Sequence, residues 1–164
     1  MFRTAILIAS DKGSRGERQD ISGDVIAEFI REMGFEQCER TIVPDDRETI
    51  SKTLVRLADE VQCDLILTSG GTGFSPRDWT PEATLDIVHR PVPGIPEALR
   101  AAGLKKTNRA MLSRAVAGIR GNTLIINLPG SPKAVAENLE ELKDVLTHGL
   151  EILTGKTGEC ARKE

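Results

Sequence analysis

Short apolar runs alternate with amphipathic segments along most of the chain, and this alternation limits its possible folds more than any other feature. Apolar runs occupy residues 3–10 and 63–71, and a weaker one occupies residues 37–44. Strands that read as nearly continuous apolar runs are typical of parallel sheets buried on both faces. Strand–helix alternation is typical of the same architecture. We therefore predict an α/β fold, a three-layer sandwich with a mainly parallel sheet and helices on both faces.

Several segments are predicted to be helices because their apolar residues recur at helical spacing or because they begin with helix-start signals. Thr80 is predicted to cap one of them, with Pro81 at its first position. The predicted helices run from Ser22 to a natural stop at Gly34, over residues 45–61, from residue 80 onward, over residues 93–103 and over residues 131–153.

Residues 110–130 are predicted to form two strands, because Gly121-Asn122 provides the chemistry of a tight turn between them. This hairpin would place one antiparallel strand in the sheet. The chain has 164 residues, the size of one domain. No second domain boundary is visible, so we predict a single domain over residues 1–164 in which residues 153–164 form a polar tail.

Composition excludes several classes of function. The net charge is −3 and aromatic residues make up 3% of the chain, so no nucleic-acid partner is expected. No apolar run approaches ~18 residues, and the N-terminal segment turns polar too soon for a signal peptide, which predicts a cytoplasmic protein without a membrane partner. The cysteines and histidines have no metal-ligand spacing, so no zinc site is expected, and Cys63 is predicted to be a small core residue.

Polar and backbone-permissive residues follow four of the predicted strands. These strand exits are Ser10-Asp11, residues 44–46, residues 69–73 and residues 127–131. Ligands of open α/β sheets bind beyond the carboxyl ends of the strands. We therefore expect the four exits to gather on one rim, and this convergence indicates a ligand site more strongly than any single motif.

Gly70, Gly71 and Gly73 end the third strand in the sequence Gly-Gly-Thr-Gly. One interpretation is a tight turn from strand to helix. The other is a phosphate site, because glycines let a ligand approach the backbone and their N–H groups can line an anion site. The motif is neither a Walker A loop nor the dinucleotide fingerprint, and by itself it fits both interpretations equally.

Asp45 and Asp78 are the carboxylates expected beside this loop. Asp45-x-x-Glu48 reads as a capping box, so helix capping alone would explain Asp45. Asp78 precedes the predicted cap Thr80, which makes a capping role for Asp78 redundant. Two carboxylates that face a phosphate-binding loop would suit a Mg²⁺ ion bridging phosphate oxygens.

Gly130 and the cap residue Ser131 stand at the start of the longest predicted helix, and Lys133 adds a positive charge there. The free N–H groups and the dipole of this helix end form a second anion site. Two anion sites together with a metal pair predict phosphoryl or nucleotidyl transfer between a polyphosphate and a second phosphorylated compound.

Three segments in combination resemble the Mog/MoaB-type molybdopterin adenylyltransferases, whose domain also occurs in plant molybdenum-cofactor enzymes and in gephyrin. They are LILTSGGTGFSPRDWTPEAT, AMLSRAVAGIRGNTLIINLPGSPKAVAENLE and VPDD. The resemblance covers residues 3–153. It implies an α/β domain, usually a homotrimer, that joins molybdopterin to ATP in the presence of Mg²⁺ and releases pyrophosphate. It also implies a hand-over of the product to a molybdenum insertase.

Carried over by position, the resemblance makes Asp45 and Asp78 the catalytic and metal-binding residues. The positions that it implies for the nucleotide phosphates are Gly70, Gly71, Thr72, Gly73, Ser10 and Asp11. The positions that it implies for the pterin substrate are Asp20, Ser113, Gly130 and Ser131.

Trp79 departs from the family, which more often has valine at that position. Because neighbours on an extended segment point apart, Trp79 is expected to face away from the ligand side of Asp78 and to make a packing or subunit contact. The alternative to an enzyme is a non-catalytic pterin-binding or scaffold relative of the same fold. The retained pair of carboxylates favours the enzyme, because a binding protein does not need two metal-competent acids.

Overall fold

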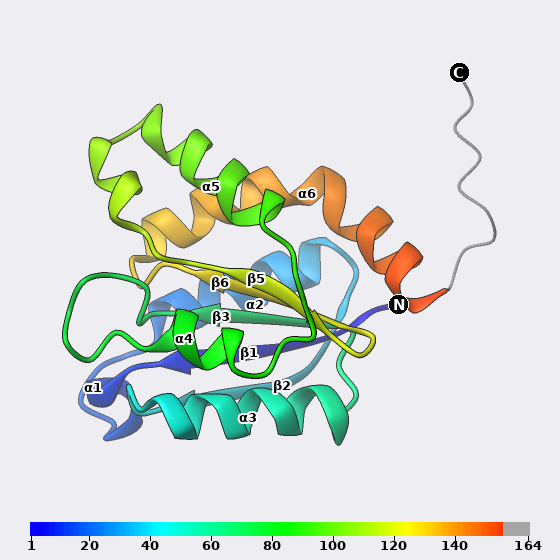
Figure 1. Ribbon diagram of the computed structural model, residues 1–164, viewed down its shortest axis with the longest axis horizontal. Helices are drawn as coiled ribbons and strands as arrows, with labels where there is room; N and C mark the ends of the chain where they lie inside the picture. Colours follow the sequence, from blue (N-terminus) through cyan, green and yellow to red (C-terminus); the bar gives the residue numbers. More distant parts are fainter. Residues whose placement is uncertain (156–164) are drawn as a thin grey trace.

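The structure, a computed structural model that describes residues 1–155, is a six-stranded sheet between two layers of helices (Figure 1). The strands are β1 (Arg3–Ala9), β2 (Glu36–Val43), β3 (Leu65–Ser69), β4 (Arg90–Pro91), β5 (Ala117–Arg120) and β6 (Thr123–Leu128). Their order in the sheet is β2-β1-β3-β6-β5-β4. β5 pairs antiparallel with both of its neighbours, and the other pairings are parallel. The predicted three-layer α/β fold with one antiparallel strand is confirmed.

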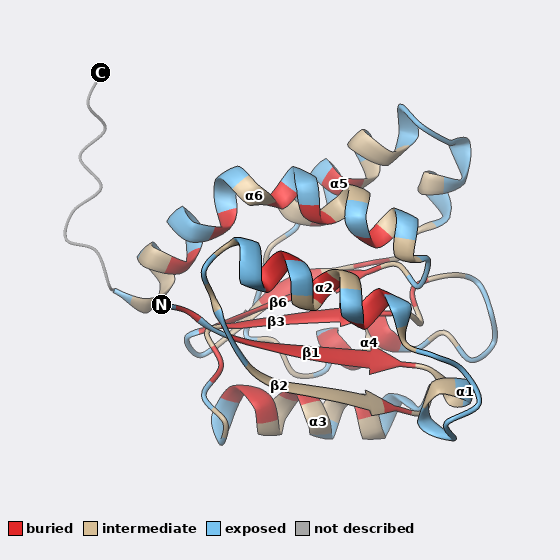
Figure 2. Cartoon of the chain, turned by 180° about the vertical axis from the view of Figure 1, so that it is seen from behind, coloured by how far each residue is buried: buried red, intermediate tan, exposed pale blue. Residues whose placement is uncertain are grey.

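Helices cover both faces of this sheet. One face carries α2 (Ile21–Glu32), α5 (Gly94–Leu104) and α6 (Pro132–Thr154), as the rear view shows (Figure 2). The other face carries α3 (Arg47–Asp59) and α4 (Thr80–Leu85). Two shorter helical segments, α1 (Asp11–Ser14) and the 3₁₀ turn η1 (Asn108–Leu112), lie in the connections.

The central strands are largely apolar because each of them contributes side chains to two cores. Ile6 and Ile126 are fully buried or nearly so and pack against the α2 and α6 side. Leu7 and Ile125, their neighbours along the strands, are fully buried and pack on the α3 side. Burying each side chain of this size stabilises the fold by about 1.5–3 kcal/mol. The two cores therefore hold β1, β3 and β6 rigidly, and their carboxyl ends make a firm base for a site.

Some elements differ from the sequence-based expectation. β4 was not expected. The first strand of the hairpin expected over residues 110–130 begins only at Ala117, because η1 occupies the start of that segment. The segment expected to be a loop after β1 contains the helical turn α1, where the Ser10 hydroxyl accepts the Gly13 N–H at 3.0 Å. α6 continues to Thr154, so the expected tail begins inside it, and residues 156–164 lie outside the described part of the chain. Within residues 1–155, none of the helices has the length and apolar character to cross a membrane.

Candidate active site

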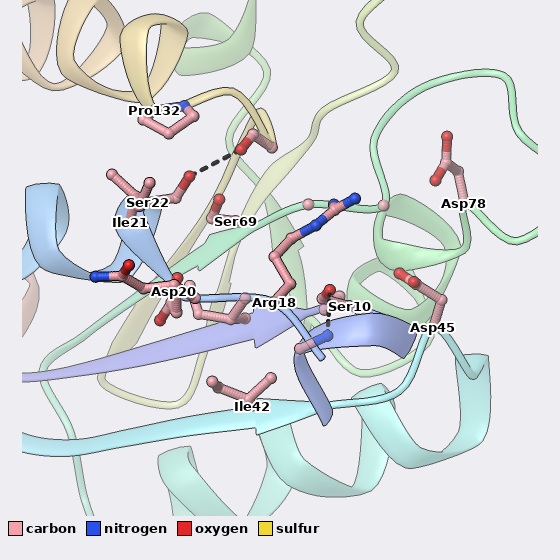
Figure 3. Close-up of a pocket in the computed structure, with 17 residues that line it drawn as sticks. Ser10, Arg18, Asp20, Ile21, Ser22, Ile42, Asp45, Ser69, Asp78 and Pro132 are labelled. Atoms are coloured by element: carbon pink, nitrogen blue, oxygen red, sulfur yellow. Dashed lines mark hydrogen bonds between the residues drawn. The ribbon is translucent and has the colours of Figure 1, made fainter. Parts of the chain in front are cut away.

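A cavity of about 560 Å³ opens at the carboxyl ends of β1, β3 and β6, and we call it the rim pocket (Figure 3). Its volume lies within the range that holds small-molecule ligands. Residues from all four of the expected strand exits line it together with the start of α2. The predicted site residues in its wall are Ser10, Asp20, Asp45, Gly70, Gly71, Asp78 and Gly130.

The glycine loop that follows β3 is a tight turn whose geometry requires glycine. Gly70 and Gly71 have φ angles of +93° and +68°. A Cβ atom on Gly70 would lie 2.4 Å from the carbonyl oxygen of Ala9, and one on Gly71 would lie 2.3 Å from Oγ1 of Thr80. Side chains other than hydrogen are therefore excluded by both strain and contact.

The same turn also leaves backbone donors without partners. The Gly70 N–H is engaged, because it donates to the carbonyl oxygen of Leu128 at 3.2 Å. Within the described part of the chain, the N–H groups of Gly71, Thr72 and Gly73 donate no hydrogen bond. Consecutive unpaired amides are the usual means of holding an anion by backbone alone. The turn and the anion site expected from the motif are thus compatible with each other.

Asp45 and Asp11 hold two strand exits together by a reciprocal pair of hydrogen bonds. The Asp11 N–H donates to Oδ2 of Asp45 at 2.9 Å, and the Asp45 N–H donates to Oδ1 of Asp11 at 3.0 Å. Arg77 grips the Asp11 carboxylate with two further hydrogen bonds of 3.0 and 2.9 Å. Asp11 therefore links Arg77 to Asp45 through hydrogen bonds. It is not among the residues that line the rim pocket.

The pKa values of Asp11 and Asp45 are shifted in opposite directions. Hydrogen bonding from Arg77, followed by the backbone hydrogen bond from Asp45, lowers the pKa of Asp11. Burial raises the pKa of Asp45, and repulsion by Asp11 and Asp78 raises it further. Asp45 thus carries a negative charge that its surroundings compensate poorly, and a cation beside it would relieve this.

Asp45 does not cap α3, which corrects one of the two interpretations of that residue. The N-cap is Asp46, whose carboxylate accepts the Thr49 N–H at 2.8 Å. The expected capping box is therefore misplaced by one residue. Because Asp46 performs the capping, the Asp45 side chain is free to face the rim pocket.

Asp78 closes the turn that leads into α4. Its carboxylate accepts the Ser75 N–H at 3.0 Å, and its Oδ2 is 2.9 Å from the place that a Cβ on Gly73 would take. The expectation that Thr80 caps α4 was wrong: the N-cap position is Trp79, which makes no capping hydrogen bond. Thr80 is the first helical residue, and its buried hydroxyl has no partner within residues 1–155.

Arg114 organises the backbone of the same loop. Its Nε donates to the carbonyl oxygen of Gly73 at 2.7 Å, and its Nη2 donates to that of Asp78 at 2.7 Å. The Arg114 N–H also donates to the carbonyl oxygen of Thr72 at 2.9 Å. The glycine loop and the Asp78 turn are therefore held in one fixed arrangement from outside the rim pocket.

Two other predicted residues act mainly as helix caps. Asp20 caps α2 through the Gly23 N–H at 2.7 Å and pairs with Arg40 at 2.7 Å, so its charge is balanced although it lines the rim pocket. Ser131 caps α6 through the Ala134 N–H at 3.5 Å and does not line the pocket, whereas Gly130 before it does.

A second cavity, of about 280 Å³, lies beside the first, between α5, η1 and the start of α6, and we call it the lateral pocket. Thr72, Gly73 and Ser113 line this cavity and not the rim pocket. Its wall also includes apolar side chains such as Leu99 and Leu112. The predicted site residues other than Asp11 and Ser131, which line neither cavity, therefore divide between two pockets that meet at the glycine loop.

Arg18 is the residue of the rim pocket that sequence reasoning missed. It is the one lysine or arginine in that wall within residues 1–155, and none of the ion pairs or hydrogen bonds of the described residues involves it. Figure 3 shows it reaching from the loop before α2 into the pocket. No sequence signal distinguishes Arg18 from Arg15 in the same polar loop, although Arg15 pairs with Glu17 at 3.0 Å.

The pocket does not contain a ready-made metal cage. Within residues 1–155, no three His, Cys, Asp or Glu side chains come together as a resident metal ion would need. Trp79 lines neither pocket, and its ring lies over the guanidinium of Arg47 at 5.7 Å, as expected for a residue that faces away from the ligand side.

The model of a protein family described as a probable molybdopterin binding domain matches residues 5–148. The chain belongs to this family. The resemblance seen in the three sequence segments is thereby confirmed, and the match covers nearly all of the described residues.

Members of the family with solved structures or curated names agree with this assignment. The chain is 43% identical over 152 residues to the molybdopterin adenylyltransferase of Helicobacter pylori J99, which covers 92% of this chain and 86% of that protein. It is 41% identical over 156 residues to the molybdopterin adenylyltransferase of Escherichia coli K12, covering 91% of this chain and 80% of that protein. The crystal structure of the molybdopterin biosynthesis enzyme MoaB of Thermus thermophilus matches with a TM-score of 0.91 and 52% identity, covering 97% of this chain and 100% of that one.

Proposed function

We propose that this protein is a molybdopterin adenylyltransferase that acts in molybdenum cofactor biosynthesis. An oxygen of the terminal phosphate of molybdopterin forms a bond to the α-phosphorus of ATP. The bond from that phosphorus to the bridging oxygen of the β-phosphate breaks, and pyrophosphate leaves. The observation that carries the proposal is the convergence of Asp45, Asp78 and the glycine loop on one pocket, in a chain 39–43% identical to several relatives with this name.

The rim pocket is the place for the phosphates of ATP. Gly71 offers an unpaired amide, and the N-terminus of the long helix α6 opens on the same wall at Gly130 and Pro132. Helix N-termini and loop amides both stabilise phosphate oxygens. Arg18 adds a guanidinium that no carboxylate of the described residues neutralises. These donors are already in place to stabilise the negative charge that develops on the leaving pyrophosphate.

Mg²⁺ fits this site as an ion that arrives with ATP. Asp45 and Asp78 supply two carboxylates, and the raised pKa of Asp45 indicates a charge that lacks a counterion. Mg²⁺ in proteins is usually bound by one or two carboxylates together with substrate phosphates and water. When bound, the ion would neutralise phosphate charge. Within residues 1–155, no three His, Cys, Asp or Glu side chains form a group that could hold a metal ion by themselves, which agrees with an ion shared with the substrate.

The lateral pocket is the place for the pterin of the second substrate. Of the residues that the family resemblance assigns to the pterin, Ser113 lies in this wall together with apolar side chains, whereas Asp20 and Gly130 line the rim pocket. The two pockets adjoin the glycine loop from opposite sides, with Gly71 in one wall and Gly73 in the other. Substrates held in both pockets would meet at this loop, and such positioning makes a bimolecular reaction effectively unimolecular.

Asp45 is the residue whose removal should affect turnover most. We expect Asp45→Asn to lower the rate of pyrophosphate release at saturating ATP and molybdopterin by about a hundredfold or more, because the change removes a charge beside the phosphates while keeping the side-chain shape. The matched control is Asp46→Asn. It removes the same charge one residue away, and asparagine is an equally good N-cap.

Two results would decide this test. A near-normal rate in Asp45→Asn would remove Asp45 from the mechanism. A loss of similar size in both variants would show that the charge acts through the helix α3 and not through the pocket. Binding of molybdopterin, measured separately by fluorescence of the pterin, should persist in Asp45→Asn, because the proposed pterin site lies in the other cavity.

The second candidate is a non-catalytic pterin-binding or scaffold relative of the same fold. The electrostatic state of Asp45 favours the enzyme, because a half-buried carboxylate repelled by two others is costly and useful only if a cation joins it. The two functions differ in one simple readout. The enzyme consumes ATP when molybdopterin is present and not otherwise, whereas a scaffold binds the pterin without consuming ATP.

We further propose that the protein works in the cytoplasm as a homotrimer and passes adenylyl-molybdopterin to a molybdenum insertase. These proposals come from the family resemblance. Trp79 and Leu85 are 39% and 50% exposed in the single chain, and they provide an apolar surface beside the Arg47–Asp86 ion pair. Light scattering would test the trimer, and a Trp79→Ser variant that stays trimeric would show that this surface is not the subunit contact.

A further inference from the structure

Two cysteines that are far apart in the sequence meet at the end of the sheet opposite to the rim pocket. Cys38 lies in β2 and Cys63 precedes β3, with a sequence separation of 25 residues. Their Sγ atoms are 3.0 Å apart. Cys63 is buried, with 2% of its surface exposed, and Cys38 is partly exposed. The pair plays no part in the proposed reaction.

A bulge in the edge strand brings the Cys38 side chain to this position. β2 pairs with β1 in parallel, with Thr4 opposite Gln37 and Ala5 opposite Glu39, so the register shifts at Cys38. Cys38 is the extra residue that has no partner in β1. Bulges of this kind redirect the side chain that they insert. Because a regular strand would have paired Cys38 with β1, the bulge is what allows its sulfur to approach the segment before β3.

Cys63 is held in place from several sides. Its N–H donates to the carbonyl oxygen of Leu57 at 3.1 Å, and its carbonyl oxygen accepts the hydroxyl of Thr123 at 2.6 Å. Gln62 before it has a φ angle of +58° and is the one residue other than glycine with a positive φ in residues 1–155. Such backbone conformations persist where the surroundings enforce them. The Cys63 sulfur is therefore fixed, and Cys38 is brought to it.

We propose that Cys38 and Cys63 form an intramolecular disulfide bond when the protein meets an oxidising thiol pool. A disulfide needs the sulfurs at about 2.05 Å, so the two atoms must approach by roughly 1 Å. An edge strand with a bulge can make a movement of this size more easily than a central strand. The proposal stands on the geometry of the pair and is independent of the proposed function.

The reaction is a thiol–disulfide exchange in two steps. The thiolate of Cys38, the more exposed partner, attacks a small disulfide such as oxidised glutathione, forms a mixed disulfide and releases one reduced glutathione. The Cys63 thiol then loses its proton to solvent and attacks Sγ of Cys38, releasing the second reduced glutathione. Two protein thiols are oxidised and one external disulfide is reduced. Burial, followed by the hydrogen bond with Cys38, raises the pKa of Cys63, so the second step is the slower one and accelerates with rising pH.

The cross-link would join the edge of the sheet to its centre. β2 has β1 as its one neighbour in the sheet, and the bond would tie β2 to the start of β3 on the far side of β1. It would also close the loop that contains α3. Constraining a loop of this length in the unfolded chain stabilises the folded state. The rim pocket lies at the other end of the strands, so we expect its activity to be retained.

The test uses the full chain with Cys160, which lies outside the described residues, replaced by serine. The protein is equilibrated with buffers of defined ratio of oxidised to reduced glutathione and quenched with acid. Intact mass should fall by two hydrogens, both free thiols should disappear together, and a digest should yield a peptide pair linking Cys38 to Cys63. The oxidised form should melt about 5–10 °C higher than the reduced form, and dithiothreitol should reverse the shift.

Cys38→Ser in the same background is the matched control, because it removes the exposed partner and leaves the buried one in its core position. This variant should show no change in melting temperature between the two buffers. The proposal is overturned if the parent protein keeps a stable glutathione adduct on Cys38 without loss of the second thiol. It is also overturned if both thiols remain free while an unrelated accessible dithiol is oxidised in the same buffer.

Discussion

The two ends of the parallel strands differ in how completely their carboxylates are neutralised: the carboxyl end also has an arginine-paired carboxylate, Asp11, but it adds one with a raised pKa. At the amino end, Arg120 pairs with Asp59 at 2.7 Å, and Arg56 pairs with Glu39. Both carboxylates have lowered pKa values, because the arginine in each pair donates hydrogen bonds to them. At the carboxyl end, the pKa of Asp45 is raised by burial and by repulsion from other carboxylates.

The glycines with positive φ angles at the two ends of the strands also differ in their surroundings. Gly34, near the amino end, has a φ angle of +67° in open space, where an added Cβ would meet nothing within 4 Å. Gly71, at the carboxyl end, has nearly the same φ angle but is enclosed by Thr80. The carboxylates named at the amino end are therefore neutralised by arginines of the protein itself. The other end keeps uncompensated charge, unpaired amides and close backbone contacts where we propose that the substrates bind.

The largest effect that would test this contrast is expected from Gly71→Ala against Gly34→Ala. Alanine at Gly71 combines a left-handed backbone with a contact of 2.3 Å to a buried hydroxyl, so we expect a loss of about 2–4 kcal/mol in the free energy of unfolding. Alanine at Gly34 should cost about 1 kcal/mol, from the backbone alone. Urea denaturation measures both free energies of unfolding. Equal losses would show that the close contact with Thr80 adds nothing to the cost of a side chain at Gly71.

A smaller effect is expected from Arg18→Ala, with Arg15→Ala as its control. Both variants remove one positive charge from the same loop, but Arg18 lines the rim pocket whereas Arg15 is paired with Glu17. We expect the KM for ATP to rise about tenfold in Arg18→Ala, the size of one charge-assisted hydrogen bond, with a smaller change in kcat. Arg18→Lys should recover part of the loss. If the two alanine variants have the same KM, the charge acts at long range and Arg18 does not contact the phosphates.

The smallest effect concerns acid sensitivity at the amino end. Glu39 has a pKa lowered from 4.5 by its hydrogen bond with Arg56. The contribution of the Glu39–Arg56 pair to stability is complete above pH 4.5 and is lost as the pH falls through the lower pKa that Glu39 has in the folded state. Glu39→Gln should therefore reduce the stability at pH 7 by about 0.5 kcal/mol and flatten the decline of stability below pH 4.5. Chemical denaturation at several pH values measures this, and an unchanged slope would show that the pair does not titrate with folding.

Much of the fold followed from local patterns. The apolar runs of β1 and β3, the helical spacing in α2 and the Gly-Asn turn between β5 and β6 indicated these elements correctly, although β5 begins later than expected, at Ala117. The glycine loop was recognised as special because a strand that stops at consecutive glycines is unusual by itself. These features depend on near neighbours in the sequence, and so a sequence reveals them.

The errors and omissions have a different origin. The cap of α3 was assigned to Asp45 because Asp45 and Asp46 have the same chemistry, and only the backbone path shows that Asp46 faces Thr49. Arg18 was overlooked because it differs from Arg15 only in having no ion-pair partner among the described residues. Whether an arginine has such a partner depends on which carboxylates the fold places near it. Cys63 was interpreted as a core residue without reference to Cys38, because a one-residue bulge in an edge strand leaves no mark in the pattern of side chains.

The sequence alone therefore determined the architecture, the membership of the family and the edge of the sheet where a ligand would bind. These follow from the period of apolar residues and from motifs that are read along the chain. Only the tertiary structure decided which carboxylate lacks a counterion, which arginine is free to meet a phosphate and which cysteines come together. Those properties depend on positions within a few ångströms of residues that are distant in the chain, because hydrogen bonds and charge compensation act over such distances.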